Sequence, residues 1–363
     1  MGNLSRREIL PWIGPAQKVR AEVAAVAAGK EKVQAVLPGG RSLFAVPNPV
    51  ATLESGEGGS RIQKLRHYFE YLLIRFFGAL LSLFPLSFLL SLSRPLGPFL
   101  FHILPRSRKT ALENLRQVYG SQKSEAEICQ MAKETFVYLS EFGMEWLCMA
   151  KIARRPAHYL GIEGVRQIHA ALQKKRGAML LVSHNANWEI MALIAGRLIA
   201  EPVGAAIYAL ARPLKNPYLY YYVLRLRGLT GLKSISKIGA VRQTFKRLKQ
   251  NGIVCLLIDQ RVNEGAVEAR FFGRKALTTS LPAIAAIRLG TPLFHVFMRR
   301  HPGPKYVMEI EGPILIAMTG NRDQDIRINT QKFNDRIEEE IRKNPARWLW
   351  MHNRWRIRHG PKD

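Results

Sequence analysis

A short apolar run at residues 178–182, Ala-Met-Leu-Leu-Val, is the feature that most constrains the fold of this chain. Basic residues and a glycine precede the run and polar residues follow it, which is the pattern of a buried strand. A mostly apolar helix is predicted over residues 190–199. Asn185 or Asn187 can cap this helix, because an Asn side-chain oxygen accepts a hydrogen bond from a free first-turn amide.

The corner between this strand and helix places His184 at the carboxyl end of the strand and Glu189 in the first helical turn. Open α/β sheets bind their ligands at that edge. A histidine can take a proton near neutral pH, and a carboxylate that accepts its other ring hydrogen fixes the tautomer. The pair alone also fits a second interpretation, in which His184 bonds to the backbone and Glu189 is a carboxylate favoured by the helix dipole.

The rest of residues 161–363 alternates between strand and helix. Strands are predicted at residues 204–210, 253–258, 268–272, 292–298 and 306–310, and helices at residues 218–227, 240–250, 281–289 and 328–343. This alternation predicts an α/β fold with a mostly parallel or mixed central sheet flanked by helices. Glu338, Glu339 and Glu340 in the last helix are expected to face solvent.

Three regions precede this α/β domain. Residues 1–60 contain glycine-rich stretches and indicate a flexible extension. Residues 61–105 are the most apolar, and residues 76–93 carry no charge but are interrupted by Pro85. This length is marginal for a transmembrane helix of about 20 residues. A membrane anchor, either as one span or as a helix pair in the interface, and a helix hairpin packed on the domain are all compatible with the pattern.

Residues 106–160 form a helical region, with helices predicted at residues 110–119 and 126–149. Glu141 and Glu145 lie one turn apart on the second of these helices. We expect them to form part of a solvated face.

The charge of the chain is strongly positive, with 55 Lys and Arg against 27 Asp and Glu, or +28. Such a charge favours anionic partners, namely nucleic acid, acidic lipid surfaces or acidic carrier proteins. Residues 212–261 and the stretch from Arg342 onward are both rich in Lys and Arg, and we expect them to meet at one mouth. Tyrosines and tryptophans interleave with these charges, which suits a membrane–water interface. They are Tyr220, Tyr221, Tyr222, Trp348, Trp350 and Trp355.

Several reaction and binding classes lack their motif in this chain. It has no Gly-x-Ser-x-Gly elbow, glycine-rich phosphate loop or His-Glu-x-x-His helix, and no nucleic-acid-binding signature. A histidine–carboxylate pair without a protein nucleophile fits direct group transfer. We therefore expect no metal, no cofactor and no nucleic acid partner.

The residues from His184 to Glu189, His-Asn-Ala-Asn-Trp-Glu, resemble the H-x4-(D/E) motif of glycerolipid acyltransferases. They look most like the form found in bacterial lipid A biosynthesis acyltransferases of the lauroyl and myristoyl type. Three further blocks follow in that family's order: Ala211-Arg212-Pro213 with Asn216-Pro217, Ile258-Asp259-Gln260 with Phe271-Phe272-Gly273, and the tryptophan-rich residues 345–356. Ala186 departs from the pattern, because the family usually has glycine there, and Asn185 stands where an aromatic residue is common.

The resemblance implies a glycerol-phosphate-acyltransferase-like fold whose residues 61–105 anchor it to the bacterial inner membrane, with the catalytic domain on the cytoplasmic side. It also implies an acyl carrier protein thioester, or acyl-CoA, as donor and a hydroxyl of a lipid A precursor or related glycolipid as acceptor. The basic surface suits an acidic carrier protein.

In this interpretation His184 is the general base and Glu189 orients it. Asn187, Arg212, Asp259 and Gln260 are expected to bind substrate, with Arg212 fixing a phosphate or carboxylate through bidentate hydrogen bonds. Arg354 and Arg356 are expected to anchor the protein at the interface. Two alternatives remain open: an acyltransferase acting on a lysophospholipid or amino-acid lipid, and a non-catalytic basic module that binds membrane or RNA.

Overall fold

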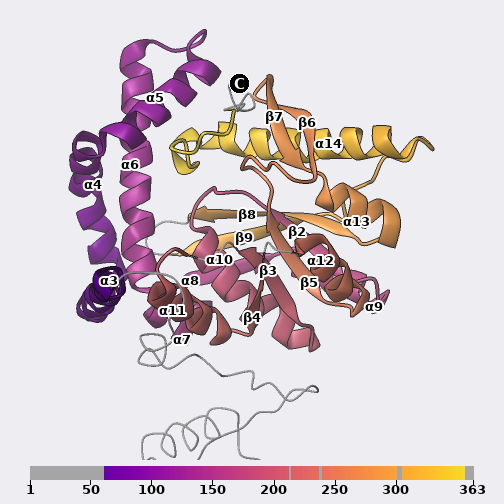
Figure 1. Ribbon diagram of the computed structural model, residues 1–363, viewed down its shortest axis with the longest axis horizontal. Helices are drawn as coiled ribbons and strands as arrows, with labels where there is room; N and C mark the ends of the chain where they lie inside the picture. The colour runs from indigo at the N-terminus through magenta and orange to yellow at the C-terminus, as the bar shows by residue number, and fades with distance from the viewer. Residues whose placement is uncertain (1–60, 212–213, 237–238, 301–304, 356–363) are drawn as a thin grey trace, which may run out of the picture. The chain divides into compact units, whose positions relative to one another are not determined.

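The computed structural model describes residues 61–211, 214–236, 239–300 and 305–355 (Figure 1). The predicted flexible extension at residues 1–60 lies outside the described residues, and so do Arg212 and Arg356.

The first described part is helical. It contains α3 (Arg61–Leu81), α4 (Leu86–Ile103), α5 (Pro105–Tyr119), α6 (Glu125–Leu147), α7 (Met149–Arg154) and α8 (Pro156–Tyr159). Residues 76–93 do not form one helix, because the chain turns before Pro85, which precedes the first residue of α4. The two helices form a pair instead. α6 begins with a capping box, in which Ser124 and Glu127 bond to each other's backbone amides.

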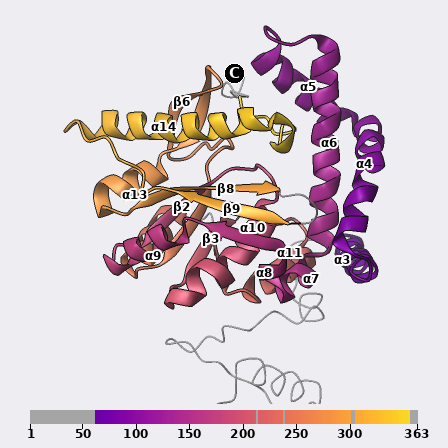
Figure 2. The same ribbon diagram turned by 180° about the vertical axis from the view of Figure 1, so that it is seen from behind.

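These helices stand beside the sheet. Figures 1 and 2 both show α6 next to the sheet and α4 on its outer side. The two helices approach closely at Gly97, where an added Cβ atom would lie 2.5 Å from the Cα of Val137. A side chain at this position would therefore force α4 away from α6.

The α/β part contains a seven-stranded sheet in the order β1-β9-β8-β2-β5-β3-β4. Its strands are β1 (Leu160–Glu163), β2 (Ala178–Val182), β3 (Ile207–Ala211), β4 (Leu232–Ser236), β5 (Ile253–Leu257), β8 (Leu293–Arg300) and β9 (Tyr306–Glu311). All neighbours are parallel except β8 and β9. The predicted mostly parallel or mixed α/β sheet is therefore confirmed.

Helices cover both faces of this sheet, and all but the last of them lie between strands in the chain. They are α9 (Val165–Gln173), α10 (Trp188–Ala195), α11 (Pro217–Gly228), α12 (Ala240–Lys249), α13 (Leu281–Leu289) and α14 (Arg322–Lys343). A separate antiparallel hairpin consists of β6 (Ala266–Phe271) and β7 (Arg274–Thr279). It packs against α14 (Figure 1).

β2 lies in the middle of the sheet and is buried along its whole length. Met179 and Leu181 belong to the core shared with α12, α13 and α14, while Leu180 and Val182 belong to the core shared with α9 and α10. The sequence of a strand that is covered on both faces is a continuous apolar run. This explains why the strand could be predicted from sequence with its observed bounds.

The C-terminal segment after α14 inserts three large side chains into the protein interior. Trp348 and Trp350 have almost no exposed surface. Arg354 is fully buried: its guanidinium donates to the carbonyl of Leu277 and the hydroxyl of Thr278, both at 2.6 Å. Burial lowers the pKa of Arg354 to about 10. The expectation that Arg354 and these tryptophans sit at a membrane interface is wrong, since β6 and β7 cover this segment.

The last helix also differs from expectation. Glu339 is exposed, as predicted, but the expectation is wrong for Glu338 and Glu340, whose side chains are only 13% and 4% exposed. Arg299 donates to both oxygens of Glu340, at 2.9 and 3.1 Å, and Lys343 donates at 3.0 Å. These cations compensate a carboxylate that faces the sheet rather than solvent.

Candidate active site

The corner after β2 is held from two sides. The backbone amide of Ala186 donates to the carbonyl of Arg347 at 3.1 Å, and its carbonyl accepts from the Tyr138 hydroxyl at 2.5 Å. Ala186 has a φ of 50°, a left-handed conformation that glycine adopts more easily. This explains why glycine would suit this position. The corner keeps its shape with alanine because α6 and the C-terminal segment hold it.

His184 and Asp259 meet at the carboxyl ends of the neighbouring parallel strands β2 and β5. The ring Nδ1 of His184 lies 2.8 Å from Oδ1 of Asp259, and the backbone amide of His184 donates to Oδ2 at 2.7 Å. The indole of Trp348 also donates to Oδ2 at 2.7 Å. An ionised carboxylate beside Nδ1 places the ring hydrogen there, so Nε2 is left to accept a proton.

Asp259 is fully buried and remains ionised. Burial by itself raises the pKa of its carboxyl group. The charge of His184, the two hydrogen bonds from His184 and the bond from Trp348 outweigh burial and hold the pKa below its ordinary value. The carboxylate is therefore available to hold the His184 ring at neutral pH.

Aromatic rings fix the His184 ring from the side. Its centroid lies 4.7 Å from that of Trp188, in an edge-on arrangement. Phe142 of α6 in turn stacks on Trp188 at 4.4 Å. The His184 side chain is only 12% exposed, so its orientation is set by the fold.

Glu189, which we expected to orient His184, pairs with Arg227 of α11 instead. Arg227 donates to both carboxylate oxygens at 2.9 Å, and both side chains are largely buried. The second residue of α10 points toward α11, whereas the end of β5 lies beside the end of β2. The carboxylate that contacts His184 is therefore that of Asp259.

Asn187, one of the two residues proposed as a cap, is the N-cap of α10, and it is buried. Its oxygen accepts from the amide of Ile190, and its amide group donates to Glu145 at 2.8 Å. Both polar ends of the side chain thus hold the corner in place.

Glu145 is itself fully buried and accepts from Arg300 at 2.6 Å and from the Tyr306 hydroxyl. Glu141 is also buried, between Arg300 and Arg347. The expectation that Glu141 and Glu145 form part of a solvated face of α6 is wrong. Cations from β8 and from the C-terminal segment cover these carboxylates, and the sequence of α6 alone gave no sign of them.

Three further residues of the family blocks are Gln260, His352 and Arg212. Gln260 directly follows Asp259 and is half-buried. His352 belongs to the tryptophan-rich block, but no role in the site was predicted for it. Burial lowers the pKa of this histidine to about 4, against the opposing charge of Asp259, so it is neutral at pH 7. Arg212 lies outside the described residues.

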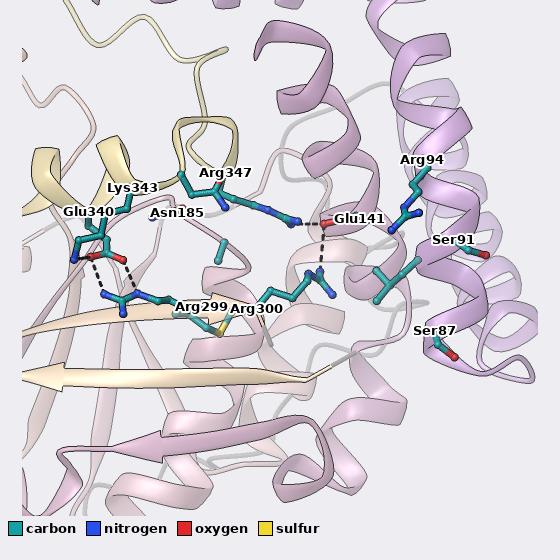
Figure 3. Close-up of a pocket in the computed structure, with 14 residues that line it drawn as sticks. Ser87, Ser91, Arg94, Glu141, Asn185, Arg299, Arg300, Glu340, Lys343 and Arg347 are labelled. Carbon is teal, nitrogen blue, oxygen red and sulfur yellow. Dashed lines mark hydrogen bonds and ion pairs between the residues drawn. The ribbon is translucent and has the colours of Figure 1, made fainter. Parts of the chain in front are cut away.

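A pocket of about 850 Å³ opens beside the corner (Figure 3). Asn185 and Ala186 form part of its lining, as do Ser87 and Ser91 of α4. The described residues that line it include none from residues 212–261, so the expected meeting of the two basic regions is not seen there. Its charged lining residues are Arg94, Arg299, Arg300, Lys343, Arg347, Glu141 and Glu340.

A second, smaller cavity of about 40 Å³ lies between the sheet and α10. Its lining is mainly apolar and includes Leu180, Leu257 and Met191, together with the Glu189–Arg227 pair. The histidine corner thus has a pocket with several charged lining residues and a smaller, mainly apolar cavity near it.

The sequence matches the family model of bacterial lipid A biosynthesis acyltransferases over residues 58–357. The match includes every side chain described above. A phosphatidylinositol mannoside acyltransferase of Mycobacterium tuberculosis is 28% identical over 211 residues, which are 56% of this chain and 62% of that protein. A lipid A biosynthesis palmitoleoyltransferase of Escherichia coli is 24% identical over 279 residues, which are 76% of this chain and 87% of that protein. The matched region thus spans less than two thirds of the mycobacterial relative.

Proposed function

Because this chain belongs to the family of bacterial lipid A biosynthesis acyltransferases, we propose that it moves a fatty acyl chain from an acyl carrier protein thioester to a hydroxyl of a lipid A precursor or related glycolipid. The names of the two relatives support an acyltransferase with a glycolipid acceptor.

In the proposed mechanism His184 is the general base. Its Nε2 removes the proton from the acceptor hydroxyl, and the oxygen attacks the thioester carbonyl carbon. The carbon–sulfur bond then breaks, and the imidazolium returns the proton to the leaving thiolate. Asp259 accepts the Nδ1 hydrogen throughout and stabilises the imidazolium that forms.

One observation carries this proposal: the buried Asp259 carboxylate takes hydrogen bonds from the His184 ring, the His184 backbone and the Trp348 indole. Burying a charge is costly unless it is paired and hydrogen-bonded. A module that only binds membrane or RNA gains nothing from a buried carboxylate that orients a histidine. The arrangement favours catalysis over that alternative.

The start of α10 supplies donors for the oxyanion. The amides of Trp188 and Glu189 are in the first helical turn and have no acceptor within the helix. Such amides stabilise the negative charge that develops on the thioester oxygen. Asn187 holds this turn in place, and Glu189 acts through Arg227 to fix α10 against α11. Arg212 and Gln260 remain our candidates for binding substrate.

We place α3 and α4 at the bacterial inner membrane, with the catalytic domain on its cytoplasmic side. Among the described helices, α4 is long and apolar enough to cross a membrane, by length and composition. Much of the pair's surface is apolar and exposed, as at Ile62, Phe69, Phe76 and Leu83. Basic residues accompany this surface in α3, so the pair suits an anchor in the interface of an anionic membrane.

The first test is acyl transfer by the detergent-solubilised full chain. The donors are acyl carrier protein and coenzyme A thioesters, the acceptor is a total bacterial lipid extract, and His184→Ala is assayed in parallel. We expect a new acylated lipid with wild type and a rate lower by about two to four orders of magnitude with His184→Ala.

The mass of the product identifies chain length and acceptor, and so separates a glycolipid from a lysophospholipid or amino-acid lipid. Equal turnover by wild type and His184→Ala would rule out the mechanism. Salt-dependent lipid binding without any product would favour the binding module.

A further inference from the structure

The pocket beside the histidine corner carries an excess of positive charge. Five basic residues and two acidic residues line its space of about 850 Å³. Arg299 and Arg300 also pair with Glu309 and Glu145, which lie outside the lining. The charge that no carboxylate of the described residues balances is that of Arg94, and an unbalanced cation at a cavity creates a potential that attracts an anion. The lining is therefore suited to a negatively charged group.

One carboxylate of the pocket, that of Glu141, is shared between two arginines. Glu141 accepts a hydrogen bond from Arg347, and its Oε2 lies 3.4 Å from Nη2 of Arg300. Both contacts are drawn as dashed lines in Figure 3. Arg300 also has two buried nitrogens, Nε and Nη1, that lack a hydrogen-bond partner among the described residues. The guanidinium donors in this wall thus outnumber the acceptors that the described part of the protein provides.

The opposite wall supplies a further cation. Arg94 of α4 is exposed, and no hydrogen bond or ion pair joins it to any of the described residues. In Figure 3 its side chain extends from α4 toward the side of the pocket that holds Glu141 and Arg347. Arg94 is therefore free to bind a ligand that enters beside α4.

The position of the pocket indicates where that ligand comes from. Asn185 and Ala186, next to His184, line it on the protein side, and the apolar, exposed helix α4 lines it on the other. A lipid whose chains lie against α4 would bring its head group into the pocket and a hydroxyl close to His184.

We propose that this pocket binds a phosphate ester in the head group of the acceptor lipid, with Arg94, Arg300 and Arg347 as its ligands. The inference rests on the proposed function, since it concerns the acceptor of that reaction. A guanidinium group can bind phosphate through two parallel hydrogen bonds to two of its oxygens. Several guanidinium groups that line one pocket therefore suit a phosphate, which carries several charged oxygens. The pocket has room for a sugar beside the phosphate.

Binding is tested without any reaction. Glucose 6-phosphate and glucose are titrated into the detergent-solubilised full chain and followed by calorimetry. We expect binding of glucose 6-phosphate and none of glucose at the same concentrations. Arg94→Gln is expected to weaken binding at least fivefold, whereas Arg106→Gln, an exposed arginine of α5 outside the pocket, leaves it unchanged. Equal binding of both sugars, or equal affinity in wild type and Arg94→Gln, would overturn the proposal.

A second variant tests whether removing a carboxylate from the pocket strengthens phosphate binding. Glu141→Gln removes the carboxylate that competes for Arg300 and Arg347, so the sugar phosphate is expected to bind at least threefold more tightly. Circular dichroism at the same temperature confirms that the variant is folded. Weaker or unchanged binding by the folded variant contradicts the proposal, because a purely structural Glu141 would not improve binding when it is lost.

Steady-state kinetics with a lipid A precursor identify which substrate carries the phosphate. We expect Arg94→Gln to raise the KM for the acceptor at least fivefold and to leave kcat and the donor KM unchanged. A rise in the donor KM alone would assign the pocket to the phosphodiester of the donor and overturn the proposal. If wild type binds glucose 6-phosphate but transfers no acyl group, the proposed function fails while the phosphate site stands.

Discussion

At the scale of single residues, the candidate site depends on one buried carboxylate. Asp259 has no exposed surface and takes three hydrogen bonds, two from His184 and one from Trp348. In each of these bonds the partner donates and Asp259 accepts. A side chain with its own N–H group at position 259, such as that of asparagine, would place a donor against one of these donors. The site therefore requires an acceptor-only side chain.

Asp259→Asn is expected to lower kcat by about two to four orders of magnitude, because the amide cannot accept every bond and the His184 ring loses its productive tautomer. The measurement is kcat at a temperature well below the melting point of both proteins. Glu189→Gln is the matched control, and we expect it to cost much less, since Glu189 contacts Arg227 and not the ring. A larger loss of kcat in Glu189→Gln than in Asp259→Asn would return the orienting role to Glu189.

At the scale of elements, α6 links the helical part to the sheet. Its Glu145 is fully buried and is held by Arg300, Tyr306 and Asn187. A buried carboxylate must be paired, and breaking such a pair leaves an uncompensated charge. α6 thus fixes the end of β8, the start of β9 and the capped start of α10 at the same time.

Glu145→Gln is expected to reduce the free energy of unfolding by about 3 kcal/mol, because Arg300 loses its closest anionic partner. Urea denaturation measures this change. Glu113→Gln serves as the control: its pair with Lys109 is exposed and 3.9 Å long, so we expect a loss below about 0.5 kcal/mol. Similar losses in the two variants would show that Glu145 behaves as a surface carboxylate.

Elements with a strong local pattern could be predicted from sequence. The strand at Ala178–Val182 and the helix at Leu281–Leu289 appear with the predicted bounds, because unbroken apolar or small-residue runs end at clear signals. β1, β4 and β7 were not predicted. β4 is a short strand at the end of the sheet with only two buried residues, so its pattern is weak.

The contacts within the site depended on strand order and were harder to predict. His184 and Glu189 are close in sequence, which favoured that pairing, but Asp259 reaches His184 because β5 lies next to β2 in the sheet. The Trp and Arg residues of the C-terminal block have a composition that fits either an interface or a core. Only the covering hairpin decides that Trp348 and Arg354 are buried.

At the scale of the whole molecule, buried histidines make stability depend on pH. Burial, together with the charge of Arg336, lowers the pKa of His295 to about 4, although the opposing charge of Glu311 raises it. Burial lowers the pKa of His352 to about 4 as well. Both values lie below the ordinary 6.5, so between pH 6.5 and 4 the unfolded chain binds more protons than the folded one. Folding stability therefore falls as the pH falls through this window.

We expect the free energy of unfolding to decrease between pH 7 and pH 5, with His295 contributing on the order of 2 kcal/mol. Urea denaturation at the two pH values measures the decrease. His295→Leu removes one titrating group, so its decrease is expected to be smaller than that of wild type, whatever its absolute stability. An identical pH dependence in both proteins would contradict the assignment.

The indole of Trp348 reaches Asp259 across 89 residues of chain, so the order of synthesis matters for this site. His184 and Asp259 leave the ribosome well before Trp348 does, and the carbonyl of Arg347 that holds Ala186 arrives just before it. If α3 and α4 bind the membrane as proposed, a growing chain could attach there before its histidine corner is complete. The proposed acyl transfer would then begin only once the segment after α14 has packed against the corner, so a partly made chain would be bound to the membrane but inactive.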